Sequence, residues 1–230
     1  MPFEIQLVTL TDFDYIATLS EEPLGSLIDP VLFDVWPVST NAESLRRSAW
    51  SAQQDKGRFQ LDPTVKFVKV VDTGCLDLDH GEGTARKEIV SLARWHYYPD
   101  GYPQENTWME IDVFARPPAV PSFPEGLDGE EMQSFLSEAT AERGRWELTK
   151  KGSPCWILTT LVTRRGWRGK GAGGMLVEWG VTKAEEMGVV ACLEADPMAV
   201  GLYERFGFGK WGGEEVVGLV KMYRPVPKAA

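Results

Sequence analysis

The chain has 230 residues, 43% of them hydrophobic and 25% charged, which predicts one globular domain over residues 1–230 with a sizeable core. The formal net charge of −10 argues against nucleic acid or an anionic membrane as a partner, because both repel an acidic surface. It suits a cationic acceptor, although many proteins are acidic for solubility alone. No apolar run approaches the length of a bilayer crossing, and the N-terminus lacks a basic region followed by an apolar core, so we expect a soluble, cytoplasmic protein.

The first half of the chain predicts strands and helices in alternation. Residues 3–8 alternate apolar and polar side chains and predict a half-buried strand, and Thr11 and Asp12 offer the cap of a short helix. A polar helix is predicted at 42–58, and two strands at 65–71 and 88–98 flank a loop rich in Gly and Asp.

The second half continues the same alternation after an irregular segment with six prolines at 98–125. A helix is predicted at 128–146 and a strand at 156–162. A longer helix that directs Met175, Leu176 and Met187 towards the core follows and ends at Gly188. The remaining elements are a central strand at 189–193, a short helix at 198–205 and a last strand at 215–223. This order predicts an α/β domain with a mixed sheet and helices on both faces.

Two other patterns predict no metal and no disulfide. The three cysteines are few, odd in number and far apart, and Cys155 and Cys192 lie in apolar runs typical of buried free thiols. In the acidic loop around Asp77, Asp79, His80 and Glu82, only the first two residues have the spacing of a calcium loop, which favours a solvated hairpin tip.

A glycine-rich basic turn lies between the strand at 156–162 and the helix that follows it. The sequence Arg168-Gly169-Lys170-Gly171-Ala172-Gly173 places backbone N–H groups without hindering Cβ atoms at the positive end of a helix dipole, which is the arrangement of a phosphate site. Lys170 is followed by glycine rather than Ser or Thr, so a triphosphate loop is disfavoured. A dinucleotide fingerprint also fits these glycines, with Glu194 as its acidic residue, but too little chain follows to complete a doubly wound sheet.

The arginine-led form Arg168-x-x-Gly171-x-Gly173 instead resembles the pyrophosphate loop of the GNAT acyltransferases. A second segment, Leu202-Tyr203-Glu204-x-Phe206-Gly207-Phe208, resembles the final helix and turn of the same family, in the family's order and spacing. The resemblance implies a mostly antiparallel mixed sheet whose splayed strands hold an acyl-CoA. It also implies a variable helical acceptor region at about 20–62, and we interpret 99–150 as an inserted loop and helix.

The resemblance implies N-acetyltransfer from acetyl-CoA to a primary amine of a small molecule or peptide, by direct attack in a ternary complex. Tyr203 matches the tyrosine that protonates the departing thiolate as general acid. Glu194 is our candidate general base, and Glu110, Asp112, His96 or ordered water could serve in its place. The residues expected to bind acetyl-CoA are Leu161, Val162, Thr163, Arg168, Gly169, Lys170, Gly171, Ala172, Gly173 and Tyr203.

Several questions stay open from the sequence alone. The chain is either an active enzyme or a silent acyl-CoA-binding or sensory module of the same fold. The aromatic residues Trp95, Tyr97, Tyr98, Tyr102 and Trp108 either line an acceptor pocket or belong to the core. The turn Asp196-Pro197 departs from the Asn or Ser that the family often has there, and the acceptor, the acyl chain and the oligomeric state are not specified.

Overall fold

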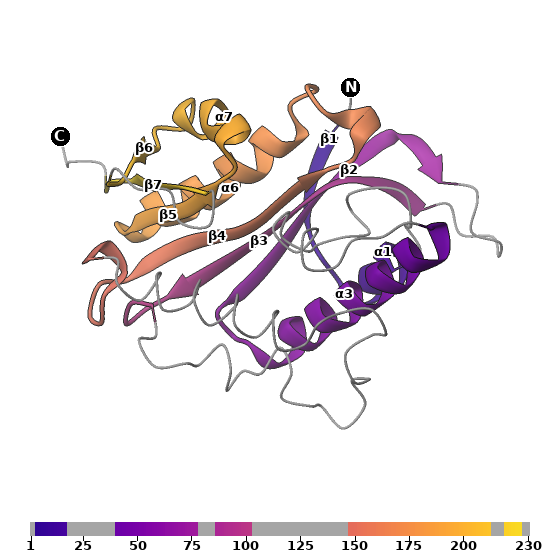
Figure 1. Cartoon of the computed structure of the whole chain (residues 1–230), viewed down its shortest axis with the longest axis horizontal. Coiled ribbons are helices and arrows are strands. Elements are labelled where there is room, and N and C mark those ends of the chain that lie inside the picture. Colours follow the sequence, from indigo (N-terminus) through magenta and orange to yellow (C-terminus); the bar gives the residue numbers. More distant parts are fainter. Residues whose placement is uncertain (1–2, 18–39, 78–85, 103–146, 213–218, 227–230) are drawn as a thin grey trace.

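A computed structural model describes residues 3–17, 40–77, 86–102, 147–212 and 219–226. Its centre is a seven-stranded sheet in the order β1-β2-β3-β4-β5-β7-β6 (Figure 1). Only β4 and β5 pair in parallel, and all the other neighbours are antiparallel. The strands are β1 (Phe3–Leu7), β2 (Val65–Asp77), β3 (Arg86–Tyr98), β4 (Cys155–Thr163), β5 (Val190–Ala195), β6 (Gly209–Lys210) and β7 (Val220–Arg224).

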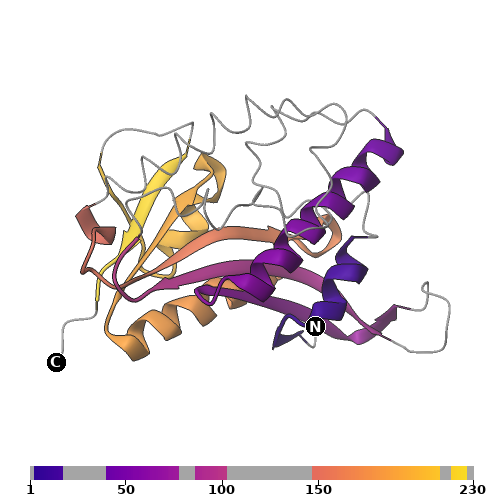
Figure 2. The ribbon, with the colours of Figure 1, turned by 90° about the horizontal axis from the view of Figure 1, so that it is seen from below.

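Helices cover both faces of the sheet, as the sequence predicts (Figures 1 and 2). On one face lie α1 (Leu10–Ile16) and α3 (Asn41–Leu61), whose apolar side chains share a core with β2 and β3. On the other face lie α6 (Ala172–Met187) and α7 (Val200–Glu204), which form a second core with the central strands. The short 3-10 turns are η2 (Glu147–Thr149), η3 (Arg165–Trp167) and η4 (Pro197–Ala199).

A close contact between helix and sheet joins α6 to β3. A Cβ atom at Gly180 would lie 2.1 Å from the indole of Trp95, so only glycine lets this helix approach the buried ring. The indole Nε1 donates a hydrogen bond of 3.2 Å to the carbonyl of Leu176. This contact fixes the height of α6 above the sheet, and thereby the position of its N-terminus.

Capping explains where the helices begin. The sequence-based cap at Thr11 and Asp12 is wrong: Thr9 is the N-cap of α1, and its backbone N–H donates to Asp12 Oδ2 at 2.6 Å. In α3, Glu43 N–H donates to Thr40 Oγ1 at 3.2 Å, which starts the helix one residue before the predicted start.

Other sequence-based predictions of elements also differ from the structure. Met187 is 44% exposed, because α6 ends there and its buried stripe runs through Val177, Val181 and Ala184. The helix predicted at 198–205 is η4 followed by the single turn of α7. The helix predicted at 128–146, and residues 215–218 of the last predicted strand, lie outside the described residues.

Cys155 and Cys192 are buried free thiols, as predicted. Burial raises the pKa of Cys155 to about 12 and raises that of Cys192 as well, which leaves both thiols in their unreactive form. No described helix has the length and apolar composition to cross a bilayer. Within the same described residues, no three His, Cys, Asp or Glu side chains gather as metal ligands do.

Candidate active site

The glycine-rich turn lies between β4 and α6. Gly169 and Gly171 have φ of +73° and +95°, the left-handed region that disfavours other residues. Gly171 is the N-cap of α6, and its carbonyl accepts the N–H of Met175 at 3.1 Å. The preceding N–H groups of the helix have no carbonyl one turn earlier to bond. They face the turn at the positive end of the helix dipole, where an anion is stabilised.

Two contacts hold the entrance of this turn against β3. Arg164 forms an ion pair with Glu88, and its backbone N–H donates to the carbonyl of Val90 at 3.0 Å. The Ser91 hydroxyl donates to the carbonyl of Val162 at 2.7 Å and lies 2.8 Å from the Thr163 hydroxyl. Arg164 is therefore engaged in holding the turn.

Two cationic side chains near the turn remain exposed to a ligand. Arg168 Nε donates to the carbonyl of Thr163 at 3.1 Å, and Lys170 Nζ lies 4.6 Å from the centre of the Trp167 ring. Both residues are exposed. Neither contact is an ion pair, so each side chain keeps a positive charge available to an anion.

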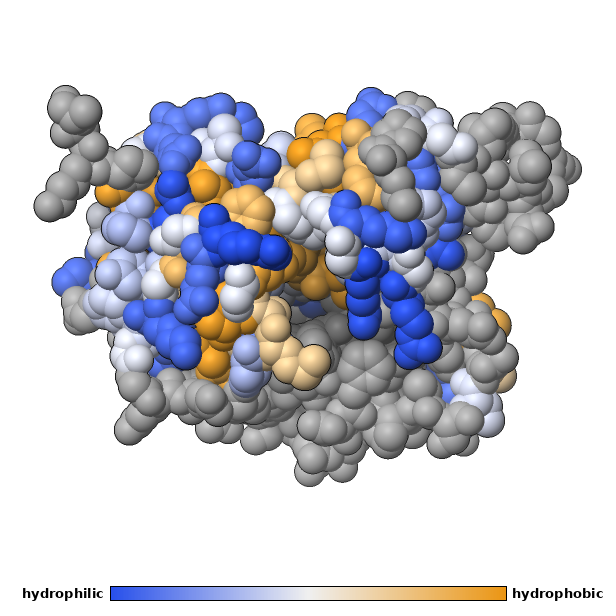
Figure 3. Space-filling model, turned by 90° about the horizontal axis from the view of Figure 1, so that it is seen from above, coloured by the Kyte–Doolittle hydropathy of each residue, from blue (hydrophilic) through white to orange (hydrophobic). Residues whose placement is uncertain are grey.

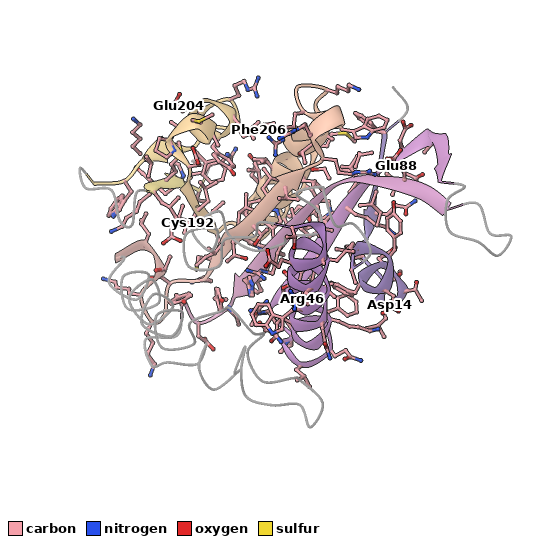
Figure 4. The ribbon with its side chains drawn as sticks, turned by 45° about the vertical axis from the view of Figure 1, so that its right-hand side comes forward. Asp14, Arg46, Glu88, Cys192, Glu204 and Phe206 are labelled. Atoms are coloured by element: carbon pink, nitrogen blue, oxygen red, sulfur yellow. The ribbon has the colours of Figure 1, made fainter. Side chains whose placement is uncertain are left out.

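The first turn of α6 is packed closely between neighbours. A Cβ atom at Gly173 would lie 3.1 Å from Thr163 Oγ1, and one at Gly174 would lie 3.2 Å from the ring of Phe206. In Figure 4, Phe206 and Glu88 lie on either side of the turn, whereas Arg46 of α3 and Asp14 of α1 belong to the layer on the opposite face. The sequence predicts Gly173 for ligand binding, and the structure shows that Gly173 and Gly174 also lie in close packing contacts.

β4 and β5 separate beside this turn. Their parallel pairing runs from Cys155 and Val190 to Leu158 and Leu193. β4 then continues to Thr163, still paired to β3, while β5 pairs with β7 as far as Ala195. Figure 3 looks into the molecule from the top of Figure 1 and shows a hollow with apolar side chains along its border. The predicted residues Leu161, Val162 and Thr163 are the last three of β4, all beyond the end of the pairing.

Tyr203 lies on α7 and is 7% exposed. Its ring meets Phe208 edge to face, with centroids 6.1 Å apart, and belongs to the core on the α6 face. Packing therefore holds the ring in one orientation on the face that carries the glycine turn.

Glu194 lies at the end of β5, paired with Lys221 of β7, and is half-buried. Its neighbours Leu193 and Ala195 pack into the α6 face, so alternation along the strand directs Glu194 to the opposite face. Tyr203 and Glu194 therefore lie on opposite faces of the sheet, and Glu194 directly follows the last residue of β5 that pairs with β4.

His96, which the sequence also offers as a base, is a structural residue. Its side chain is fully buried, its Nδ1 lies 3.2 Å from Thr64 Oγ1 and 3.5 Å from Asp62 Oδ2, and its ring stacks on Tyr98. Burial lowers the pKa of His96 to about 4, helped by the charge of Arg94. The carboxylates of Glu110 and Asp112 lie outside the described residues.

The four of these aromatic residues that the structure describes fall into two separate clusters. Trp95 and Tyr97 pack into the core on the α6 face, whereas Tyr98 and Tyr102 belong to a separate cluster with Cys155. Trp108 lies outside the described residues.

Sequence reasoning missed a buried charged cluster between α3 and the sheet. Asp55 Oδ1 accepts hydrogen bonds of 2.6 Å from Arg58 and from Arg94. Arg94 Nε in turn donates to Thr159 Oγ1 at 2.9 Å. Asp55 and Arg58 are three residues apart and are therefore neighbours on one helix face, a spacing from which their ion pair could have been predicted. Their partners lie far along the chain and have no local pattern.

Comparison with protein families matches residues 87–208 to the Acetyltransferase (GNAT) family. No curated protein matches the chain. Among solved structures, the chain is similar to arylalkylamine N-acetyltransferase 2 from Aedes aegypti, at 12% identity and a TM-score of 0.56 over 98% of this chain and 100% of that one. It is also similar to "histone acetyltransferase HPA2 and related acetyltransferase" from Corynebacterium glutamicum, at 19% identity and a TM-score of 0.55 over 100% of this chain and 99% of that one.

These two structures share the mixed α/β fold at identities that speak for the fold alone. The family match is the stronger finding, because it spans more than half of the chain and includes the glycine turn and Tyr203. The chain therefore belongs to the GNAT acetyltransferase family.

Proposed function

We propose that this protein is an N-acetyltransferase that moves the acetyl group of acetyl-CoA to a primary amine of a small molecule or peptide. The observation that carries the proposal is the separation of β4 from β5 directly beside the glycine turn. The turn would hold the pyrophosphate through the N–H groups of Gly169 to Gly173, with charge from Arg168 and Lys170. The free edge of β4 at Leu161 to Thr163 would pair with the pantetheine arm.

The reaction is direct attack in a ternary complex. The amine nitrogen bonds to the acetyl carbon, the carbon–sulfur bond breaks, and the electron pair leaves on sulfur as a thiolate. Tyr203 protonates that thiolate from the α6 face, and Glu194 accepts the proton of the attacking amine from the opposite face. Their placement on opposite faces supports this division, because donor and acceptor can then enter from different sides.

The competing function is a silent acyl-CoA-binding or sensory module of the same fold. Both functions require the turn, so binding alone does not separate them. Turnover does, because a sensor would bind acetyl-CoA and yield no acetylated amine.

The first experiment is a calorimetric titration of the protein with acetyl-CoA, desulfo-CoA and NADH. We expect both CoA species to bind and NADH not to bind. An amine panel that includes peptides then tests for release of CoA. If neither CoA species bound, the acyltransferase proposal would be wrong; binding of NADH alone would favour the dinucleotide interpretation of the glycines.

A further inference from the structure

A β-bulge lies where β4 leaves β5. In the register between β3 and β4, Arg94 faces Thr160 and Trp95 faces Leu158, so Thr159 is one residue extra. Leu158 is also the last residue of β4 that pairs with β5. The extra residue therefore occupies the first position of β4 beyond the parallel pairing.

The bulge decides which backbone groups of β4 face the space beside β5. In an antiparallel ladder, alternate residues direct their N–H and C=O groups to the partner strand, and the others direct them to the opposite edge. One extra residue shifts this alternation by one. The N–H groups between Thr159 and Thr163 that point away from β3 are therefore set by the bulge.

Side-chain hydrogen bonds hold the bulge in place. The Thr159 hydroxyl donates to the carbonyl of Arg94 at 3.2 Å and accepts from Arg94 Nε at 2.9 Å. One residue of β3 thus binds the extra residue of β4 through both its backbone and its side chain.

Helix α3 anchors the same arginine. Arg94 Nη1 donates to Asp55 Oδ1 at 2.6 Å, and the Asp55 side chain is only 1% exposed. Arg58 binds the same carboxylate oxygen at 2.6 Å. Because one buried carboxylate holds both guanidinium groups, the orientation of Arg94 depends on α3.

We propose that Arg94 and Thr159 are positioning residues that fix the β4 bulge so that its outward N–H groups polarise the thioester carbonyl. The chain Asp55–Arg94–Thr159 links α3 to the edge of β4 that meets the acyl group. Neither Arg94 nor Thr159 exchanges a proton with the substrate. The proposal rests on the proposed function, because it requires acetyl-CoA beside β4.

The test is the carbonyl stretch of acetyl-CoA labelled with ¹³C at the carbonyl carbon, measured by infrared difference spectroscopy on the bound ligand. Hydrogen bonds to a carbonyl oxygen lower its stretching frequency. We expect a lowered frequency in the unmodified protein and in Thr159→Ser, which keeps the hydroxyl. Thr159→Val has nearly the same shape without the hydroxyl, and its frequency should return towards that of the free ligand.

Two further variants separate the effect of the hydrogen bonds between Arg94 and Thr159 from the effect of the charge cluster around Asp55. Arg94→Met removes the bond to Thr159 and should lose the frequency shift, whereas Arg58→Met perturbs the same carboxylate without contacting Thr159 and should keep it. Calorimetry with CoA checks that each variant still binds, since the glycine turn is unchanged. A variant that fails to fold shows no CoA binding and is replaced by the Thr159→Val and Thr159→Ser pair.

The outcomes are distinguishable. An unchanged frequency in Thr159→Val that still binds acetyl-CoA would overturn the positioning role and leave the proposed function standing. Absence of acetyl-CoA binding in the unmodified protein would overturn both. A shift lost in Thr159→Val and kept in Thr159→Ser would support the proposal.

Discussion

At the scale of single residues, Gly171 allows a direct test of the phosphate site. Its φ of +95° is strained for valine, at a cost of roughly 1–2 kcal/mol, but a Cβ there meets no protein atom within 4 Å. Gly171→Val should therefore fold cooperatively and lose acetyl-CoA binding, because the branched side chain would occupy the space of the phosphate. Gly152→Val is the matched control, since Gly152 has φ of +83° and equally open space in a turn before β4. Calorimetry that found equal binding by both variants would contradict the assignment.

Substitution of Tyr203 tests its proposed role as the general acid. We expect Tyr203→Phe to bind acetyl-CoA as the unmodified protein does, because the ring keeps its packing against Phe208. Its turnover should fall by about 10²-fold or more, the usual contribution of a general acid. The measurement is kcat for CoA release with any amine that the panel identifies. Turnover that stayed unchanged would remove Tyr203 from the mechanism and leave water as the proton donor.

A site residue could be predicted from the sequence when the residues it acts with are its neighbours along the chain. The turn from Arg168 to Gly173 is predictable because its glycines, its cations and the start of a helix are adjacent in the sequence. The link from Asp55 to Arg94 and Thr159 is not, because it joins α3, β3 and β4 over long separations. A polar side chain with a distant partner looks the same in the sequence as one that faces solvent.

At the scale of elements, substitution of two helical glycines by alanine should have opposite effects on the free energy of unfolding. A Cβ at Gly180 would penetrate the Trp95 ring, whereas one at Gly57 in α3 meets nothing within 4 Å. Gly180→Ala should lower the free energy of unfolding by about 1–3 kcal/mol through overpacking. Gly57→Ala should raise it by about 0.5–1 kcal/mol, because alanine loses less backbone entropy in a helix.

Urea denaturation of the two variants measures both effects, provided that the transition slope stays the same. If Gly180→Ala were as stable as the unmodified protein, α6 would not be held at its height by Trp95. The position of the glycine turn above the sheet would then need another cause.

Element types were easier to predict than element ends. Strand and helix periodicity identified the main elements. The predicted buried face of α6, however, included Met187, which is 44% exposed. The sequence-based cap of α1 was placed at Thr11 and Asp12, whereas the structure forms it from Thr9 and Asp12. Such choices depend on side-chain geometry that periodicity does not contain.

At the scale of the whole molecule, the two faces of the sheet have different environments. The α6 face carries an apolar core, the glycine turn and Tyr203. The α3 face carries, beside its own apolar core, the buried cluster of Asp55, Arg58 and Arg94 and the pair of Asp62 and His96. This asymmetry makes the α3 face the one whose stability depends on ionisation.

His96 makes global stability sensitive to acid. Burial lowers its pKa from 6.5 to about 4, and Arg94 and Arg58 act in the same direction, while Asp62 acts against them. The unfolded chain therefore takes up a proton at a pH where the folded chain keeps His96 neutral. Protons favour the unfolded state between these two values, so stability falls as the pH falls from 6.5 to about 4, by on the order of 3 kcal/mol.

His96→Gln should flatten this dependence, because glutamine keeps hydrogen-bonding capacity and does not titrate. We expect the difference in free energy of unfolding between the unmodified protein and His96→Gln to shift in favour of the variant by on the order of 3 kcal/mol across this window, whatever its value at neutral pH. Asp62, whose pKa is lowered to about 2, acts in a separate window: its contribution is present above its ordinary value of 3.8 and is lost only as the pH falls further. Urea titrations from pH 7 to 4 measure the difference. A gap between the two proteins that stayed constant over that range would mean that His96 is protonated in the folded state as readily as in the unfolded chain.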